Sequence, residues 1–222
     1  MTAPFPILFE DNHLLVVDKP AGIAMEPGGK EPTNLLDTFK NFIKARDQKP
    51  GRVFLGLVHR LDKPVAGVVV FAKTSKAASR LAEQFRTHTI QKTYHTMVEM
   101  RGKNIPKGSW QEFTQYISKE DGAARVRVSD KKIVGAKEAR MAYRLVRIND
   151  GTGLMEVRPH TGRPHQIRAG LASLGLPIIG DRLYGSRKAS PGGIALLAKT
   201  ISFDHPTAKK RLTIESWQKL SE

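Results

Sequence analysis

The amino-acid sequence predicts an α+β fold in which strands outnumber helices and the sheet is mixed but mostly antiparallel. Short runs rich in β-branched residues recur along the chain and are separated by turn signals such as Asn149-Asp150-Gly151. Three other segments carry apolar residues at helical spacing instead. Because strands and helices do not alternate regularly, a parallel sheet built from βαβ units is disfavoured.

The first half of the chain is expected to open with a hairpin over residues 7–18, closed by the turn residues 19–22. Thr33 is expected to cap a first helix and Ser75 a second. Their apolar positions are Leu35, Leu36, Phe39, Phe42 and Ile43 in the first, and Ala78, Leu81, Ala82 and Phe85 in the second. Residues 53–61 and 64–73 are predicted strands that meet at Asp62-Lys63, which places this acid at a junction and not inside a strand.

The second half is expected to be an antiparallel region over residues 110–158, with Asp121-Gly122 as a further turn. Thr161 and Pro164 mark the start of a third helix, and Gly175 follows its end. Residues 94–99, 194–203 and 212–216 read as strands. The sequence shows neither a repeat nor a linker, so we expect one domain over residues 1–222. We also expect a monomer.

The charge balance favours a polyanionic partner. Thirty-seven Lys and Arg against twenty-one Asp and Glu give a formal net charge of +16, which favours nucleic acid through counterion release. A generally basic surface without such a partner stays an alternative. An anionic membrane is less favoured, since the basic residues do not collect on one amphipathic helix.

The absence of cysteine excludes disulfides, thiolate metal sites and a cysteine nucleophile, and it suits a reducing compartment. Residues 1–11 lack the pattern of a secretory leader, and the most apolar run, residues 65–72, is too short to span a bilayer. We therefore expect a cytoplasmic protein.

An acid and a distant arginine are the first candidates for chemistry. His59-Arg60-Leu61-Asp62 places two possible cations before the acid, and Arg168 offers a guanidinium that would keep Asp62 ionised. An ordinary structural ion pair or a turn-capping aspartate stays open. Tyr94 stands near a strand start, where its ring suits stacking on a base, although a half-buried core tyrosine is the plainer interpretation.

No metal or nucleotide cofactor is indicated. The seven histidines form no recognisable ligand set. His160 and His165 flank a helix start, where capping or phosphate contact is expected. Gly28-Gly29 and Gly192-Gly193 lack the spacing of a phosphate-binding loop, so turns suffice there.

Several ordered motifs together resemble the RluA-type family of pseudouridine synthases, enzymes that isomerise uridine in RNA. The main motifs are His59-Arg60-Leu61-Asp62, Gln91-Lys92-Thr93-Tyr94, Thr161-Gly162-Arg163-Pro164-His165-Gln166-Ile167-Arg168 and Ile178-Ile179-Gly180-Asp181-Arg182-Leu183-Tyr184-Gly185. Val16-Val17-Asp18-Lys19-Pro20-Ala21-Gly22 and Asp204-His205-Pro206 extend the resemblance over nearly the whole chain.

The resemblance implies a role for each matching residue. Asp62 corresponds to the catalytic aspartate and Arg168 to the basic residue paired with it. Tyr94 corresponds to the tyrosine that packs against the target base, and Arg60 to the arginine that fills the gap left by the flipped nucleotide. RNA contacts are also expected from His59, Arg163 and His165. The family fold has a bent sheet with a central cleft, its substrates are ribosomal or transfer RNA, and it needs no cofactor.

The sequence departs from the family pattern at two positions, and two alternative functions stay open. Gly170 and Leu197 stand where the family often has histidine, and no separate N-terminal RNA-binding module is apparent. The chain is alternatively a non-catalytic RNA-binding or ribosome-assembly protein. A glycosidase or nucleosidase that pairs Asp62 with Asp181 or Glu156 is the second rival, and it requires a particular separation of the two carboxylates.

Overall fold

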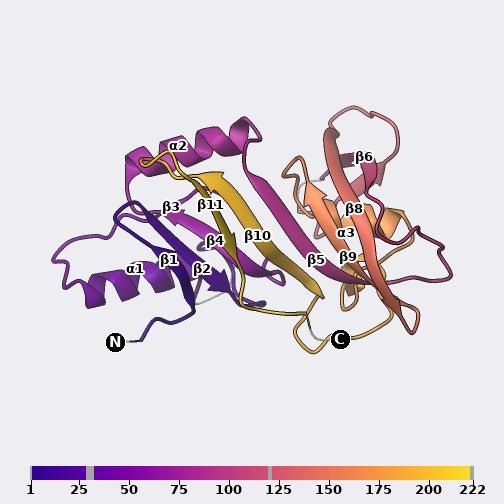
Figure 1. The fold of residues 1–222 in the computed structure, drawn as a ribbon, viewed down its shortest axis with the longest axis horizontal. Coiled ribbons are helices and arrows are strands. Elements are labelled where there is room, and N and C mark those ends of the chain that lie inside the picture. Colours follow the sequence, from indigo (N-terminus) through magenta and orange to yellow (C-terminus); the bar gives the residue numbers. More distant parts are fainter. Residues whose placement is uncertain (1, 29–32, 120–121, 221–222) are drawn as a thin grey trace. The chain divides into compact units, whose positions relative to one another are not determined.

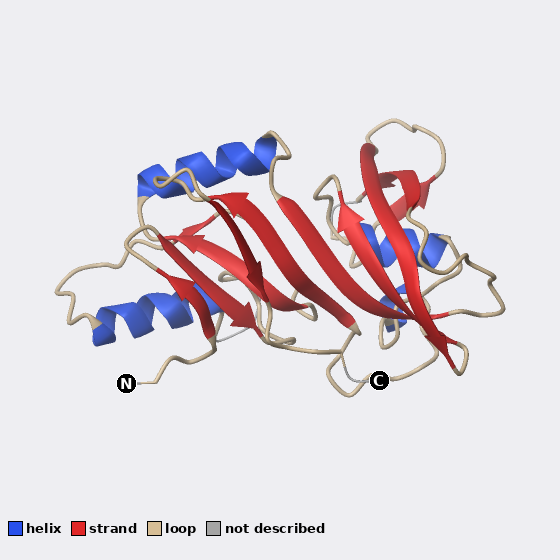
Figure 2. Ribbon diagram, in the orientation of Figure 1, coloured by secondary structure: helices blue, strands red, loops and turns tan. Residues whose placement is uncertain are grey.

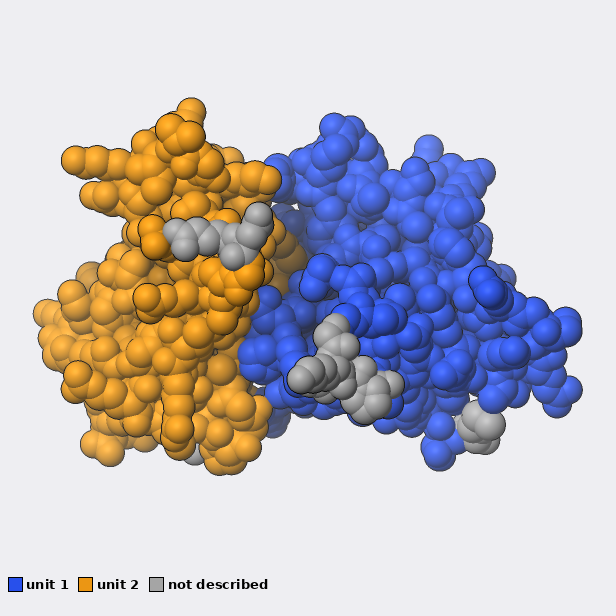
Figure 3. Space-filling view, turned by 180° about the vertical axis from the view of Figure 1, so that it is seen from behind, with its two compact units in different colours: residues 1–91, 198–219 blue, residues 92–197, 220–222 orange. Residues whose placement is uncertain are grey.

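The structure is a computed structural model that describes residues 2–28, 33–119 and 122–220. The chain divides into two compact units, drawn in different colours in Figure 3. Unit 1 consists of residues 1–91 and 198–219, and unit 2 of residues 92–197 and 220–222. Strands predominate over helices in both (Figure 2), which confirms the α+β class. The single catalytic domain over residues 1–222 stays a prediction.

The described residues of unit 1 form six strands and two helices (Figure 1). They are β1 (Ile7–Glu10), β2 (Leu14–Lys19), α1 (Leu35–Arg46), β3 (Gly56–Leu57), β4 (Ala66–Ala72), α2 (Ser75–Arg86), most of β10 (Leu196–Asp204) and β11 (Arg211–Glu215). The strands follow the order β1-β2-β4-β10, with β3 pairing β4 and β11 pairing β10. The β1–β2 hairpin expected over residues 7–18 is thereby confirmed.

The unit 1 sheet is covered on both faces, which explains why β2 and β4 are continuous apolar runs. Val16 of β2 lies opposite Val70 of β4, and both belong to a buried cluster with Leu81 of α2. The alternate residues of β2 and β4 point to the opposite face, toward α1. There the ring centroids of Phe39 in α1 and Phe71 in β4 lie 6.4 Å apart. β2, whose end leads to the motif at residues 19–22, is therefore held between two helical layers.

Unit 2 contains a second run of strands and a short helix. They are β5 (Gln91–Glu99, whose first residue belongs to unit 1), β6 (Gln111–Ser118), β7 (Arg127–Ser129), β8 (Lys137–Asn149), β9 (Thr152–Pro159), α3 (Gln166–Ser173) and the 3-10 helix η1 (Arg182–Tyr184). The order is β5-β9-β8-β6-β7, and each neighbouring pair is antiparallel. This confirms the antiparallel region, including its turn at Asn149-Asp150-Gly151.

In all three helices the N-terminal cap or first residue differs from the predicted one. Asn34, not Thr33, caps α1, because its side chain accepts a hydrogen bond from the backbone of Asp37. Thr74, not Ser75, caps α2 in the same manner. The third helix begins at Gln166, later than Thr161 and Pro164 suggested.

The delayed start of α3 has a local cause. The Gln166 side chain accepts hydrogen bonds from the Thr161 hydroxyl and the Arg163 backbone, which closes residues 161–165 into a turn. His165 then stands at the N-cap with φ 51° and makes no side-chain capping bond. The turn motif therefore precedes the helix and does not form its first residues.

The predicted strand over residues 53–61 was also wrong, since only Gly56–Leu57 pairs with β4. The residues that follow form the loop that carries Asp62. Gly29 and Asp121, on which two expected turns depend, lie outside the described residues. Within the described ranges, no helix is long and apolar enough to cross a membrane.

Candidate active site

The seven predicted site residues fall into two groups, one in each unit. His59, Arg60 and Asp62 lie on the loop between β3 and β4 in unit 1. Tyr94, Arg163, His165 and Arg168 lie in unit 2, on β5 and around α3. Each group is described within its own unit.

The Asp62 loop is fastened to the chain segment that follows β2. The Asp62 carbonyl accepts a hydrogen bond from the Val65 backbone at 2.9 Å, which closes a tight turn before β4. Gly22 donates its backbone N–H to the Lys63 carbonyl at 2.8 Å. Gly22 has φ +87°, a conformation that glycine adopts without the penalty a side chain would carry. The two motifs that contain these residues therefore form one local structure.

Lys19 supports this loop from inside the unit. Its side chain is fully buried (0% exposed), and its Nζ donates to the carbonyls of Val65 at 2.6 Å, Lys63 at 3.1 Å and Pro20 at 3.1 Å. Burial lowers the pKa of Lys19 to about 8, while the negative charge of Asp62 acts in the opposite direction. The protonated form, which prevails at neutral pH, therefore places a positive charge in the electrostatic field of Asp62.

Lys19 was missed as a functional residue. Lys19 belongs to one of the family motifs, but the motif does not reveal its total burial, which follows from tertiary packing. A sequence signal does exist, because a lysine that ends β2, separated from its apolar run by Asp18 alone, and directly precedes proline lacks the usual route to solvent.

His59 and Arg60 differ sharply in their surroundings. His59 Nε2 accepts the Val70 backbone N–H at 2.9 Å, and its ring stacks on Phe85 at 5.1 Å. These contacts tie the start of the loop to β4 and α2. Arg60, in contrast, has a side chain that is 70% exposed and pairs with Glu26 at 2.7 Å. An exposed ion pair contributes about 0–1 kcal/mol to stability. The Arg60 guanidinium can therefore leave Glu26 and bind a phosphate instead.

In unit 2, Tyr94 lies on β5 directly opposite Val157 of β9 and is half-buried. Paired residues share a face of the sheet. Val157 is in turn paired with Tyr143 of β8, on the face of the sheet that α3 covers. Lys92, two residues before Tyr94, projects to the same face. Burial lowers the pKa of Lys92. Its Nζ lies 4.0 Å from the point where a Cβ on Gly162 would stand, so a desolvated amine adjoins the turn before α3.

Arg168 is buried (5% exposed) and makes a bidentate ion pair with Asp181. Its Nε donates to Oδ2 at 2.7 Å and its Nη2 to Oδ1 at 3.0 Å. The Tyr184 ring centroid lies 5.2 Å from its Cζ, a distance at which cation–π attraction operates. Asp181 and Tyr184 therefore fix the orientation of the guanidinium. The pairing of Arg168 with Asp62 stays a prediction.

His165 and Arg163 hold the turn before α3 in place. His165 Nδ1 lies 2.8 Å from the Tyr184 hydroxyl, which also accepts the Val126 backbone N–H at 3.0 Å. Arg163 donates its Nε to the Glu138 carbonyl at 2.9 Å. Two motifs separated in sequence, around residues 161–168 and 178–185, are thus joined by Arg168–Asp181 and His165–Tyr184. Contacts of Arg163 and His165 with RNA stay predictions.

The two alternative acids are both engaged by arginines. Asp181 is buried against Arg168, and Glu156 is buried against Arg144 and Arg158. This arrangement suits structural carboxylates and disfavours a proton-donating role in a glycosidase. Within the described ranges, no three His, Asp or Glu side chains gather as a metal ion would require.

The two departures from the family pattern have different settings. A Cβ on Gly170 would lie 2.5 Å from Gln115 Nε2 and 2.8 Å from Met141 Cε, so a histidine there would displace both side chains. Gln115 Oε1 is buried and, within the part of the chain that the structure describes, accepts no hydrogen bond. Leu197 is buried within β10.

Comparison with known proteins assigns a family to this arrangement. A family model described as RNA pseudouridylate synthase matches residues 13–173. Ribosomal large subunit pseudouridine synthase D of Nitrosomonas europaea is 34% identical over 96% of this chain and 62% of its own. tRNA pseudouridine synthase C of Yersinia pestis is 30% identical over 96% of this chain and 88% of its own.

The fold has a structural counterpart as well. The human protein RNA Pseudouridylate Synthase Domain Containing 4 matches with a TM-score of 0.75 and 24% identity, over 97% of this chain and 88% of its own. The chain spans 62–65% of the length of three similar ribosomal large subunit pseudouridine synthases.

Proposed function

This chain belongs to the RNA pseudouridylate synthase family, and on that premise we propose that it isomerises uridine to pseudouridine in ribosomal or transfer RNA. Asp62 is the proposed catalytic carboxylate. The wider proposal is a cytoplasmic monomer that acts as a single catalytic domain and uses no cofactor. RNA is the proposed substrate because similar relatives are named for ribosomal large-subunit RNA and for tRNA.

The observation that carries this proposal is the support of Asp62 by Lys19. The reaction breaks the bond between ribose C1′ and uracil N1 and forms a bond between C1′ and C5. N1 gains a proton and C5 loses one, so the reaction involves no net oxidation. Asp62 serves either as a nucleophile toward C1′ or the uracil ring, or as a base toward the sugar. Each route starts from the carboxylate, and Lys19 holds the loop that presents it by donating to the carbonyls of Val65, Lys63 and Pro20.

The other proposed roles rest on the environment of each side chain. Tyr94 is half-buried on β5, where its ring would pack against the target base. Arg168, oriented by Asp181, would supply a second cation to the catalytic carboxylate. Arg60 would leave Glu26 and occupy the gap in the RNA from which uridine has flipped. Extruding the base costs a few kcal/mol, and contacts to the basic surface would offset that cost.

Asp62→Asn tests the proposal directly. The substitution keeps the size of the side chain and removes the anion, so we expect a folded, RNA-binding protein that forms no detectable pseudouridine. The measurement is tritium release from RNA labelled at uridine C5, performed in single turnover. Circular dichroism and RNA affinity should match the wild type.

Asp130→Asn is the matched control, because Asp130 is an exposed acid on the β7–β8 connection. It removes the same charge and should retain the wild-type rate. Wild-type tritium release by folded Asp62→Asn would contradict the assignment of Asp62. Absence of release from the wild type on total ribosomal and transfer RNA would instead favour a non-catalytic RNA-binding protein.

A further inference from the structure

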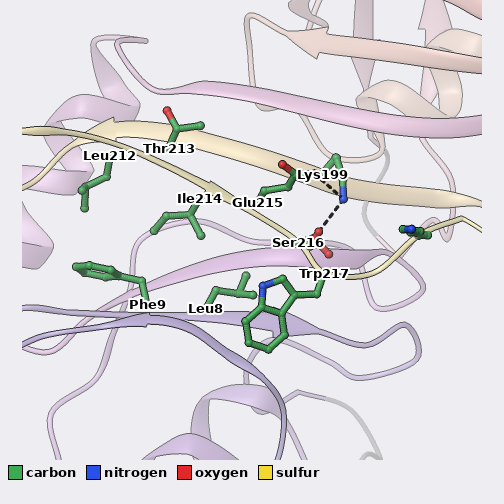
Figure 4. Close-up of a pocket in the computed structure, with 10 residues that line it drawn as sticks. Leu8, Phe9, Lys199, Leu212, Thr213, Ile214, Glu215, Ser216 and Trp217 are labelled. Atoms are coloured by element: carbon green, nitrogen blue, oxygen red, sulfur yellow. Dashed lines mark hydrogen bonds and ion pairs between the residues drawn. The ribbon is translucent and has the colours of Figure 1, made fainter.

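A groove in unit 1, whose lining includes none of the residues assigned above, is shown in Figure 4. Its cavity volume is about 660 Å³, within the range of about 300–1,000 Å³ typical of small-ligand sites. The lining comes from β1, from β10 and β11, and from the segment after β11: Leu8, Phe9, Lys199, Leu212, Thr213, Ile214, Glu215, Ser216, Trp217 and Lys219. Neither Asp62 nor Tyr94 belongs to this lining.

Trp217 presents an exposed aromatic ring from a rigid backbone. Its side chain is 67% exposed, and in Figure 4 the indole extends toward Leu8. The backbone around it is fixed by the buried carboxylate of Asp18. Asp18 accepts hydrogen bonds from the Ser216 hydroxyl at 2.8 Å, the Trp217 N–H at 2.9 Å and the Gln218 amide at 2.6 Å.

This anchoring by Asp18 distinguishes Trp217 from an exposed apolar residue whose backbone makes no such hydrogen bonds. An exposed indole leaves a large apolar area in water. Holding its backbone in place means that a flat ligand can stack on the ring at little further cost in conformational entropy. The geometry is that of a preformed stacking platform.

Lys219 brings a positive charge to the lining of the groove. Lys219 is exposed after Trp217, and Lys209 and Lys210 are exposed before β11. Lys199, in contrast, is held by Glu215 at 2.8 Å and by the Ser216 carbonyl at 2.7 Å, so it serves the groove wall. An aromatic platform beside an exposed lysine matches the pattern by which proteins bind single-stranded nucleic acid, through base stacking and phosphate contacts.

We propose that this groove binds an unpaired nucleotide of RNA, whose base stacks on Trp217 and whose phosphate contacts Lys219. The nucleotide is distinct from the uridine that is modified, because the proposed catalytic residues do not line the groove. This assignment rests on the proposed function for its choice of RNA as the ligand. It adds a second contact through which the enzyme selects where on an RNA it binds.

The chain contains two tryptophans, which permits a direct optical test. Trp110 lies beneath the guanidinium groups of Arg144 and Arg158, at 4.8 and 4.2 Å, and Trp110→Phe leaves an aromatic ring for them. In that background the emission comes from Trp217 alone. Titration with pentauridylate is expected to quench this emission saturably and to protect it from iodide.

Substitutions then test the role of the ring. In filter binding of pentauridylate by the otherwise wild-type chain, Trp217→Phe should stay within about threefold of wild type, whereas Trp217→Ala should bind about 5- to 150-fold more weakly. Ile148→Ala is the control, since it removes an exposed apolar side chain that does not line the groove. Lys219→Glu should weaken binding and reduce the salt slope by about one.

The outcomes separate this proposal from the proposed function. Unquenched Trp217 emission, or unchanged affinity in folded Trp217→Ala, would overturn the nucleotide groove. Quenching by pentauridylate together with the expected loss in Trp217→Ala would support it, even if the chain formed no pseudouridine. If Trp217→Ala failed to fold, Lys219→Glu with wild-type affinity and salt slope would overturn the proposal on its own.

Discussion

Lys19 shows how one side chain links the fold to the proposed chemistry. A buried lysine costs stability when it is charged, and that cost is visible in the lowered pKa of about 8. The amine nevertheless binds three backbone carbonyls around the Asp62 loop. We infer that the loop gains a fixed shape and a positive field at the expense of some stability at neutral pH.

Lys19→Met should lower the rate of pseudouridine formation about tenfold or more while RNA affinity stays within about twofold. The expected loss follows from removing the amine that fixes the Asp62 loop and its positive charge, and a tenfold loss of rate corresponds to about 1.4 kcal/mol of activation free energy. The measurement is single-turnover tritium release at saturating RNA, with affinity determined separately. A variant that retained the wild-type rate would show that the Lys19 charge does not assist Asp62.

The same residue gives a pH dependence with a defined sign. The pKa of Lys19 is about 8 in the folded protein against 10.5 for an ordinary lysine, so between these pH values the unfolded chain binds more protons. Its contribution to the unfolding free energy therefore rises as pH increases from 8 to 10.5, by up to about 3 kcal/mol. Urea titrations at pH 7.5 and 10 should show this rise in the wild type and its loss in Lys19→Met.

At the scale of elements, the sequence predicted the type of most strands and helices but located their ends less well. Periodicity identifies an apolar face, and this was enough for the helices and the long antiparallel strands. Cap positions depend on which neighbouring hydroxyl or amide reaches a backbone N–H, as Asn34 does in preference to Thr33. The segment 53–61 has strand-like composition, yet most of it is used to build the loop before Asp62.

The candidate site was predicted to a similar extent. Asp62, Tyr94 and Arg168 were identified through motifs, and the family resemblance that contained them is confirmed. The Asp181 partner of Arg168 was considered only as a rival acid, because a chain separation of thirteen residues does not reveal a bidentate contact. Lys19 and Trp217 were missed because burial and anchoring by distant residues are properties of the folded chain.

The start of β4 depends on a glycine. Gly67 has φ +118°, and a Cβ there would overlap the Ala198 carbonyl oxygen and lie 2.7 Å from its nitrogen. Gly67→Ala should therefore destabilise unit 1 by about 2–5 kcal/mol, combining backbone strain with steric overlap. Thermal unfolding followed by circular dichroism measures the change. Gly51→Ala, where a Cβ meets nothing within 4 Å, is the control, and equal stability of the two variants would contradict the model of close approach.

At the scale of the whole molecule, the dominant property is the charge of +16. Hydrogen bonds and ion pairs engage some of the arginines, but many lysines remain exposed along both units. Counterion release from RNA is therefore expected to provide much of the binding free energy, whereas individual contacts select the site.

Affinity for substrate RNA should accordingly fall about 10- to 100-fold between 50 and 200 mM salt, as expected when about three to four phosphates are contacted. Filter binding over this range gives the slope directly. The Asp62→Asn variant permits the titration without turnover. An affinity that did not change with salt would show that the basic surface is not a contact for RNA.

The division of the chain in sequence has a consequence for its biosynthesis. Unit 2 is nearly continuous, from residue 92 to residue 197, whereas unit 1 combines residues 1–91 with residues 198–219. During translation, unit 2 is therefore complete while β4 still lacks the neighbouring strand β10. Domains generally fold as they emerge, so the nascent chain exposes one edge of the β2–β4 pair until β10 (residues 196–204) has been made. The three hydrogen bonds that Asp18 accepts from Ser216, Trp217 and Gln218 can form only after residues 92–197 and β11 have been made, so they join residues about two hundred positions apart late in the assembly of unit 1.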